Sequence, residues 1–180
     1  QPVLNDKRQK IATVEDIIVD TDGTARLVVV KDGGLLGFGG KLAAFDYGTV
    51  IKNDGKADMV TPLTDADLKS AATFAYDAED ADEKTRLIPA EGVSIARLLD
   101  GTLQGADGQN VADIDDVTFK AGKADMVITS AGEVLEMGGK KIALGFGTAD
   151  VMRDKDDVNL KLSAQETMRF QKLEQSKSKE

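Results

Sequence analysis

The sequence predicts a mainly β protein built from two tandem copies of one unit, each of which is followed by a short C-terminal helix. Three observations support this prediction. The chain repeats itself at an offset of about 100 residues, which indicates a duplicated structural unit. Short β-branched segments alternate with turn signals in both copies. Each copy then closes on the spacing of a helix N-terminal cap.

The repeat is clearest in two pairs of segments. The segment QKIATVEDIIVD, which begins at Gln9, corresponds to QNVADIDDVTFK, which begins at Gln109, and their apolar positions coincide. After a one-residue shift at the intervening turn, residues 25–41 correspond to residues 124–140. Two shorter pairs follow: residues 47–49 with 146–148, and residues 63–67 with 162–166.

Short strands joined by tight turns are expected in each copy. In the first copy two apolar runs flank Asp22-Gly23, a dipeptide typical of β-hairpins, and in the second copy similar runs flank residues 121–123. These four strands are expected at residues 17–19, 27–30, 117–119 and 126–128. Further strands of the first copy are expected at residues 41–45, around 49–52 and near 59–61, with a turn at Asp54-Gly55.

A helix is expected at the end of each copy. Thr64 with Asp67, and Ser163 with Glu166, have the spacing of a capping box, in which each side chain bonds the backbone of the other residue. The second helix is expected from Ala164 to about residue 175. An apolar stripe along it is predicted from Thr167, Met168, Phe170 and Leu173.

The domain boundaries are expected to follow the repeat. The first domain spans residues 1–76, and its N-terminus is expected to be trimmed, because residues 93–99 read as a strand with no counterpart before Gln1. Residues 77–92 are acidic, contain Pro89, and are expected to form a linker. The second domain, with its C-terminal helix, is expected at residues 93–175, and residues 176–180 are expected to fray.

The composition excludes several kinds of chemistry. The chain has no Cys and no His, so zinc sites of the Cys/His type, disulfides, thiol catalysis and histidine general-base catalysis are excluded. The net charge of −9 disfavours non-specific binding to nucleic acid or anionic lipid, because the field of the protein repels phosphate. No apolar run approaches the roughly 18 residues that a membrane span needs.

The glycine-rich segment GGLLGFGGK, residues 33–41, raises the question of a phosphate-binding loop. The P-loop pattern requires Gly at position 35 and a hydroxyl residue at position 42, but both positions are leucine. The GGK end of the segment recurs at residues 138–140, whereas the rest of the loop differs between the copies. These glycines are therefore interpreted as turn residues, and no cofactor is expected.

The same segments resemble the PRC-barrel family, named after the cytoplasmic domain of the photosynthetic reaction-centre H subunit. In the first copy the resemblance lies in residues 11–23 and 33–41. In the second it lies in residues 98–101 and 107–117, with Glu136 in place of a family glycine. The resemblance implies two tandem small β-barrels used for docking or assembly. Members of the family occur in reaction centres and in a ribosome maturation factor, and the family is similar to no catalytic class.

The apolar residues of the glycine-rich loops are the candidate partner-binding residues. Two interpretations stay open: the loops pack onto the barrels, or they present exposed apolar tips to a partner. The candidates are Leu35, Leu36, Phe38, Val134, Leu135 and Met137.

Acidic clusters suggest metal binding, but none has a complete pattern. The segment from Asp20 to Gly23 begins like a Ca²⁺ loop, yet the positions that should hold Gly and Glu hold Ala25 and Lys31. Other acidic pairs and triplets are typical of solvated surface, and no metal site is assigned. These are Asp113 with Asp115, and Asp154 with Asp156 and Asp157.

The function predicted from these observations is a non-enzymatic protein-binding or assembly module, acting as a scaffold or adaptor. An acidic cation-binding or buffering protein is the alternative, and a carboxylate-based enzyme is the third. No catalytic residue is assigned, although a Ser–Lys arrangement stays open. The expected partner is another protein, in a membrane-associated complex or as a second copy of the chain, and not nucleic acid. The lack of Cys and the acidic surface favour an exported, periplasmic location over a cytoplasmic one.

Overall fold

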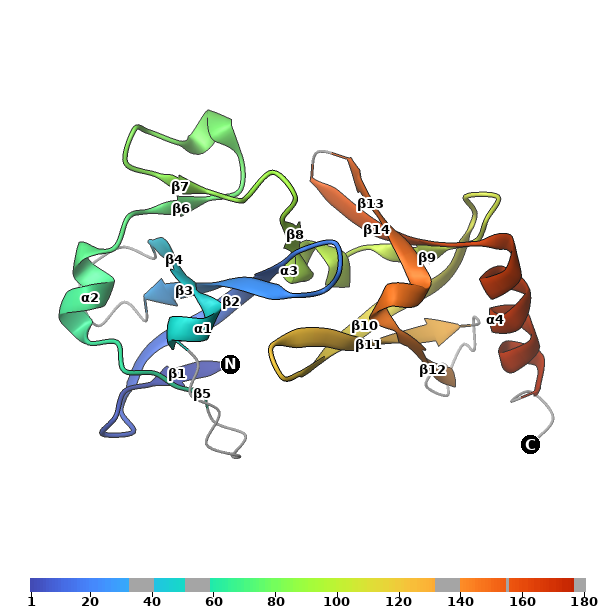
Figure 1. Cartoon of the computed structure of the whole chain (residues 1–180), viewed down its shortest axis with the longest axis horizontal. Coiled ribbons are helices and arrows are strands. Elements are labelled where there is room, and N and C mark those ends of the chain that lie inside the picture. The colour runs from blue at the N-terminus through green and yellow to red at the C-terminus, as the bar shows by residue number, and fades with distance from the viewer. Residues whose placement is uncertain (33–40, 51–58, 132–139, 155, 177–180) are drawn as a thin grey trace. The chain divides into compact units, whose positions relative to one another are not determined.

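The computed structural model describes residues 1–32, 41–50, 59–131, 140–154 and 156–176 (Figure 1). The chain forms two compact units. The first comprises Gln1–Asp20 with Ala25–Gly92, and the second comprises Thr21–Thr24 with Val93–Glu180. None of the described helices is both long and apolar enough to cross a membrane.

The first unit is built on a sheet with the strand order β4-β3-β2-β1-β5. Neighbouring strands are antiparallel except β1 and β5, which run parallel. The long hairpin β2–β3 turns at Gly23, whose φ of 86° lies in the region that favours glycine. The strands are β1 Pro2–Leu4, β2 Lys10–Val19, β3 Ala25–Asp32, β4 Leu42–Asp46 and β5 Met59–Val60.

Two short helices follow strands of this sheet. Helix α1, Tyr47–Val50, lies where a strand was expected around residues 49–52, so that prediction is wrong for the described residues 49 and 50. The hydroxyl of Thr49 donates to the carbonyl oxygen of Asp46 at 2.8 Å and stabilises this turn. Helix α2, Asp65–Ser70, has the predicted capping box between Thr64 and Asp67.

The sheet of the first unit is buried on both faces. Alternate residues of β3 divide between two apolar clusters, because successive side chains of a strand point to opposite faces. Val28 and Val30 pack with Val3, Ile11 and Leu68 on one face. On the other face, residues 27 and 29 pack with Ile18, Ala44 and Phe74.

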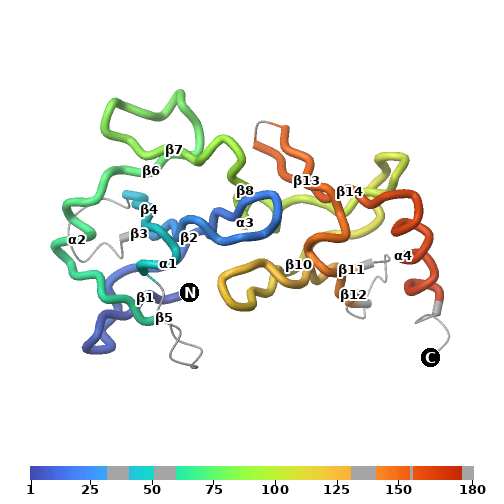
Figure 2. Tube along the Cα trace, in the orientation of Figure 1, coloured from blue at the N-terminus to red at the C-terminus, as the bar shows by residue number. Residues whose placement is uncertain are grey.

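Residues 74–88 cover that second face, and they overlap the expected linker at 77–92. They hold strand β6, Phe74–Ala75, the 3₁₀ helix η1, Ala78–Asp80, and strand β7, Arg86–Leu87, with β6 and β7 paired in parallel (Figure 2). The hydroxyl of Tyr76 donates to the buried carboxylate of Asp16 at 3.1 Å. The guanidinium of Arg86 donates to the Ala44 carbonyl at 3.2 Å and to the Asp46 carboxylate at 2.6 Å. This segment therefore completes the core of the first unit.

The second unit has the strand order β12-β11-β10-β9-β14-β13, in which β14 and β9 are parallel and all other pairs are antiparallel. Its strands are β8 Val93–Ser94, β9 Thr102–Gln104, β10 Asn110–Lys120, β11 Lys123–Ala131, β12 Lys140–Gly145, β13 Ala149–Asp154 and β14 Asp157–Leu162. Its helices are α3 Ile95–Leu99, the 3₁₀ helix η2 Phe146–Thr148, and α4 Ala164–Ser176.

The start of this unit differs from the prediction. Residues 93–99 were expected to form one strand, but the strand ends at Ser94 and α3 begins at Ile95. The Ser94 hydroxyl accepts a hydrogen bond from the backbone N–H of Arg97 at 3.0 Å. This N-cap satisfies a donor that a helix start would leave unpaired, so the chain turns into a helix at this point.

Both units share one framework. The order β4-β3-β2-β1-β5 of the first unit has its counterpart in β12-β11-β10-β9-β14 of the second. In β2 the register with β3 shifts between Val14 and Asp16 and between Ile18 and Val19. In β10 the register with β11 shifts 100 residues later, between 114 and 116 and between 118 and 119. The mainly β class is confirmed, and within the described residues the strand order of each unit runs from edge to edge without closing into a barrel.

Helix α4 confirms the predicted C-terminal helix but not the whole of its apolar stripe. Phe170 is buried, with 1% of its surface exposed. Met168 and Leu173 are 57% and 43% exposed, so their assignment to the stripe is wrong. On a helix of 3.6 residues per turn Met168 points to the side opposite Phe170, and Leu173 lies near the end of the helix.

Candidate functional site

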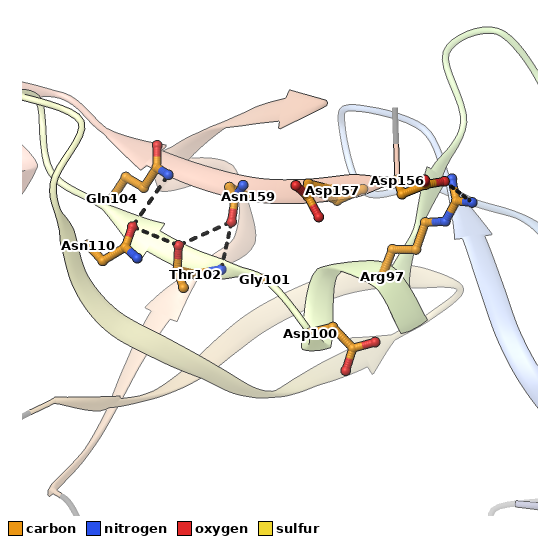
Figure 3. A pocket seen from close by; sticks show the side chains of 10 residues that line it. Arg97, Asp100, Gly101, Thr102, Gln104, Asn110, Asp156, Asp157 and Asn159 are labelled. Atoms are coloured by element: carbon orange, nitrogen blue, oxygen red, sulfur yellow. Dashed lines mark hydrogen bonds and ion pairs between the residues drawn. The ribbon is translucent and has the colours of Figure 1, made fainter. Parts of the chain in front are cut away.

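A polar hollow of about 380 Å³ lies within the second unit, lined by the end of α3 and by residues of β9, β10 and β14 (Figure 3). Hydrogen-bonded amide and hydroxyl side chains occupy one end. An ion pair occupies the other, and Asp157 lies between the two ends (Figure 3). Since all these residues belong to one unit, the site is formed by the second unit alone.

Thr102 is the centre of the amide end. Its backbone N–H donates to Oδ1 of Asn159 at 2.8 Å, which ties β9 to β14. Its hydroxyl lies 3.0 Å from Oδ1 of Asn110 and 3.1 Å from Oδ1 of Asn159, and the single hydroxyl proton serves these two acceptors. Gln104 Nε2 donates to the same Asn110 oxygen at 3.5 Å. This end therefore offers fixed carbonyl oxygens and amide groups to a polar ligand.

Gly101 allows β9 and β14 to approach at this end of the hollow. A Cβ atom at this position would lie 1.9 Å from the carbonyl oxygen of Val158, well inside the contact distance of any real Cβ. The parallel pairing of the two strands follows directly at Leu103 and Leu160. The shape of the hollow therefore depends on the missing side chain at Gly101.

The charged end, together with Asp157 beside it, holds one guanidinium and three carboxylates. Arg97 Nη2 donates to the Asp156 carboxylate at 3.0 Å, and the side chains are 22% and 75% exposed. Asp100 and Asp157 are also exposed and line the same hollow. A carboxyl that acts as a general acid usually depends on burial for that role, whereas these three lie in solvent. The arrangement suits recognition of a cationic or amide-bearing ligand.

A second hollow, of about 400 Å³, lies in the first unit between the β1–β2 turn and the start of α2. Its best-placed polar groups already serve the turn: Oδ1 of Asn5 accepts from the backbone N–H groups of Lys7 and Gln9, at 3.0 and 2.9 Å. This hollow is therefore explained by the geometry of the turn.

The predicted partner-binding residues lie outside the described part of the chain, and so do the glycines of both loops. These residues are Leu35, Leu36, Phe38, Val134, Leu135 and Met137. Lys41, which ends the first loop, is described, and its Nζ donates to the carbonyl oxygen of Ala71 at 2.7 Å. That contact gives the lysine a structural role at the end of α2.

The acidic segment at the β2–β3 turn serves the turn itself. The Asp22 carboxylate accepts from the backbone N–H of Thr24 at 2.9 Å and from its hydroxyl at 3.0 Å. The Thr24 N–H and then its hydroxyl lower the pKa of Asp22 to about 2. Asp20 pairs with Arg26.

The other acidic clusters are partly engaged in the same way. Asp115 accepts the hydroxyl of Ser130, and Asp156 is paired with Arg97. Among the residues that the structure describes, no group of three or more acidic side chains could hold a metal ion.

Two acidic residues of the polar hollow, Asp156 and Asp157, were identified from the sequence as part of a candidate metal cluster, but the sequence did not indicate the hollow or its other polar side chains. Arg97, Thr102, Asn110 and Asn159 are single polar residues without a local motif. One signal was present: the turn residues at 107–108 return β10 beside β9, and Asn110 is thereby paired with Gln104. The contact between residues 102 and 159 crosses 57 positions, so no local pattern could indicate it.

Comparison with protein families gives a match over part of the chain. The PRC-barrel domain matches residues 1–67, which run from β1 into α2 of the first unit. Comparison with curated proteins gives no match. This match confirms the resemblance of residues 11–23 and 33–41 to the PRC-barrel family. It does not extend to residues 93–180.

Proposed function

We propose that the chain is a non-enzymatic protein-binding module that assembles other proteins on two PRC-barrel-like repeats. The family match supports the assignment of the first repeat. The assignment of the second rests on the shared strand order and on the two register shifts that recur 100 residues later.

The observation that carries the proposal is an aspartate that both units have at the first register shift of their long strand, β2 or β10. At the first register shift Oδ1 of Asp16 accepts from the N–H of Ile17 at 2.7 Å, and Oδ1 of Asp116 accepts from the N–H of Val117 at 2.8 Å. These aspartates hold a β-bulge, a feature that shapes a strand. What the duplication preserves is backbone geometry, which suits a scaffold that presents surfaces.

Exposed apolar side chains add to this argument. Among the described residues of α4, Met168 and Leu173 are large, apolar and exposed. Such residues are common singly on any surface, but on α4 two of them share one helix, where a partner could cover them.

Affinity capture tests the proposal. The full chain, immobilised, is expected to retain a defined protein from native extract, with membrane and soluble fractions run separately, and excess free chain should displace it. An unrelated acidic protein of similar net charge controls for capture by charge alone. Failure to retain any displaceable protein from either fraction would contradict the proposal.

The alternative of a cation-binding protein has less support from the described residues. Asp20, Asp22, Asp115 and Asp156 each have a side-chain or backbone partner within the protein. Calorimetric titration with Ca²⁺ distinguishes the two functions, because dissociation constants weaker than about millimolar would reflect ordinary surface charge.

A further inference from the structure

Five positions of the second unit's sheet form a surface that we call the outer face: Asp116, Thr118, Met126, Ile128 and Ala143. They share one side of the strands, because Asp116 pairs with Ile128, Thr118 pairs with Met126, and Ile128 pairs with Ala143. Three of them are exposed and the two on β11 are half-buried. The outer face therefore combines a carboxylate, a hydroxyl and an apolar strip open to solvent.

The first unit shows what covers the equivalent surface. The row Asp16–Val29–Ala44 has the same register as Asp116–Ile128–Ala143. In the first unit all three residues are buried, with Asp16 only 3% exposed. Residues 74–88 achieve this burial: Phe74 packs on residues 29 and 44, and the Tyr76 hydroxyl donates to Asp16. In the described part of the second unit no segment occupies that position.

We infer that the outer face binds an extended segment of a partner protein that carries a Phe-x-Tyr pair flanked by basic residues. The inference rests on the proposed function and names the surface and the partner chemistry. The choice of an aromatic pair comes from the first unit. There the ring centroids of Phe74 and Tyr76 lie 5.1 Å apart, edge to face, above the equivalent row.

The position of β12 suits such a segment. In the first unit Thr73 pairs with Ala43 of β4, so the covering segment enters along that strand before it crosses to Asp16. Strand β12 is the counterpart of β4 and stands at the end of the strand order of the second unit. A partner strand would add to this edge and then lay its aromatic side chains across the outer face.

The charges around the outer face indicate which residues should flank the aromatic pair of the partner. Asp113 and Asp115 lie beside Asp116 on the same side of β10, and Lys141 on β12 is the one cation among the described neighbours that pair with this row. Three carboxylates against one ammonium attract a basic segment. The chain's own residues 77–83 are acidic, which disfavours a second copy of this chain as the occupant.

Peptide titration tests the inference. The full chain is titrated with the acetylated and amidated peptide KKTFAYKA, which places residues 73–76 of the chain between lysines, and with the matched peptide KKTFAFKA. The tyrosine peptide is expected to bind saturably and the phenylalanine peptide about tenfold more weakly, because the hydrogen bond to the Asp116 carboxylate is lost. Equal binding of the two peptides, or no binding of either, would overturn the inference.

Two variants place the binding on the outer face. Ala143→Arg adds a bulky cation at an exposed position and is expected to weaken binding at least about tenfold. Asp116→Asn keeps an oxygen for the Val117 N–H and is expected to weaken it about fivefold. Met152→Arg adds the same cation to β13, away from this face, and should change binding less than about twofold. An equal effect of the two arginine variants would overturn the assignment.

The same variants separate this inference from the proposed function. If Ala143→Arg abolishes the capture of a partner from native extract while Met152→Arg does not, the outer face is the docking site. If capture survives in Ala143→Arg, the inference is overturned and the proposed function stands. Sedimentation that shows a dimer of the unchanged chain, dissociated by Ala143→Arg, would also overturn it, because the occupant would then be a second copy.

Discussion

The hydroxyl of Tyr76 donates a hydrogen bond of 3.1 Å to the carboxylate of Asp16, across 60 positions of the chain. Asp16 is buried and sits at the bulge of β2, where its other oxygen accepts from the backbone N–H of Ile17. One carboxylate thus shapes the strand and fastens the segment that covers it. A buried carboxylate needs such partners, because its charge is costly without them.

Removal of the Tyr76 hydroxyl is expected to destabilise the protein. Tyr76→Phe should lower the free energy of unfolding by about 1.5–3 kcal/mol, the usual worth of a hydrogen bond to a charged group. Tyr47→Phe is the matched control, because its half-buried hydroxyl bonds no residue that the structure describes, and its effect should stay within about 0.5 kcal/mol. Urea unfolding of both variants measures the difference, and similar losses would contradict the role given to Tyr76.

The covering segment is expected to contribute to stability through Phe74. This side chain is buried among Ile18, Leu27 and Val29, so Phe74→Ala should cost about 3–5 kcal/mol. Leu87→Ala, in the same segment but exposed, should cost less than about 1 kcal/mol. If urea unfolding gives a small loss for both variants, residues 74–88 behave as a linker and do not complete the core.

Local signals account for the features that the sequence predicted. The hairpin at Asp22-Gly23, the capping box at Thr64 and the start of α4 after Ser163 each depend on a few adjacent residues. The internal repeat was visible in the sequence because residues 9–20 and 109–120 share their apolar positions, and the register shifts of β2 and β10 fall at corresponding residues of these segments. The apolar alternation of β3 also predicted a strand, although not that both of its faces are buried.

Non-local contacts account for what the sequence did not predict. Nothing near Tyr76 indicates that its hydroxyl meets Asp16, so residues 77–92 were interpreted from their acidity alone. Helices α1 and α3 contain four and five residues, too few for the periodicity of a helix to appear. The polar hollow joins Thr102 to Asn159, which lie far apart in sequence.

Protonation of Asp67 is expected to weaken the start of α2. The Thr64 hydroxyl, and then the Thr64 backbone N–H, lower the pKa of Asp67 below its ordinary value of 3.8. Because the pKa is lower in the folded state, the stabilisation is present above the unfolded value and is lost as the pH falls through the folded pKa. Thr64→Ala should raise the pKa of Asp67 toward 3.8.

A carbon NMR titration of the carboxyl groups measures this change. Asp82 provides an internal control, since Thr85 and the backbone of Lys84 lower its pKa and neither contacts Thr64. Its titration should be the same in the variant. An unchanged midpoint for Asp67 would show that the hydroxyl does not control its pKa.

Substitution of Gly101 is expected to disrupt the parallel pairing of β9 with β14. In Gly101→Ala the new Cβ would meet the Val158 carbonyl oxygen at 1.9 Å, and because Val158 lies in β14 and residue 101 directly precedes its partner strand β9, neither atom can move freely. A loss of about 3 kcal/mol is expected, as for a severe overpacking. Gly147→Ala, where no atom lies within 4 Å of the added Cβ, should be nearly neutral. Thermal unfolding that gives equal shifts for the two variants would contradict the close approach.

The contribution of Asn159 to stability is expected to come from its side-chain oxygen, as a hydrogen-bond acceptor, more than from its amide nitrogen. Its Oδ1 accepts from both the N–H and the hydroxyl of Thr102, so Asn159→Ala should lower the free energy of unfolding by about 1–2 kcal/mol. Asn159→Asp keeps an oxygen at this position and lets the hydroxyl proton of Thr102 turn to it, so stability at pH 7 should stay within about 0.5 kcal/mol. Urea unfolding compares the three proteins. If the aspartate variant loses as much as the alanine variant, the amide nitrogen or the added charge beside Asp157 decides the stability of the hollow, and the acceptor role is wrong.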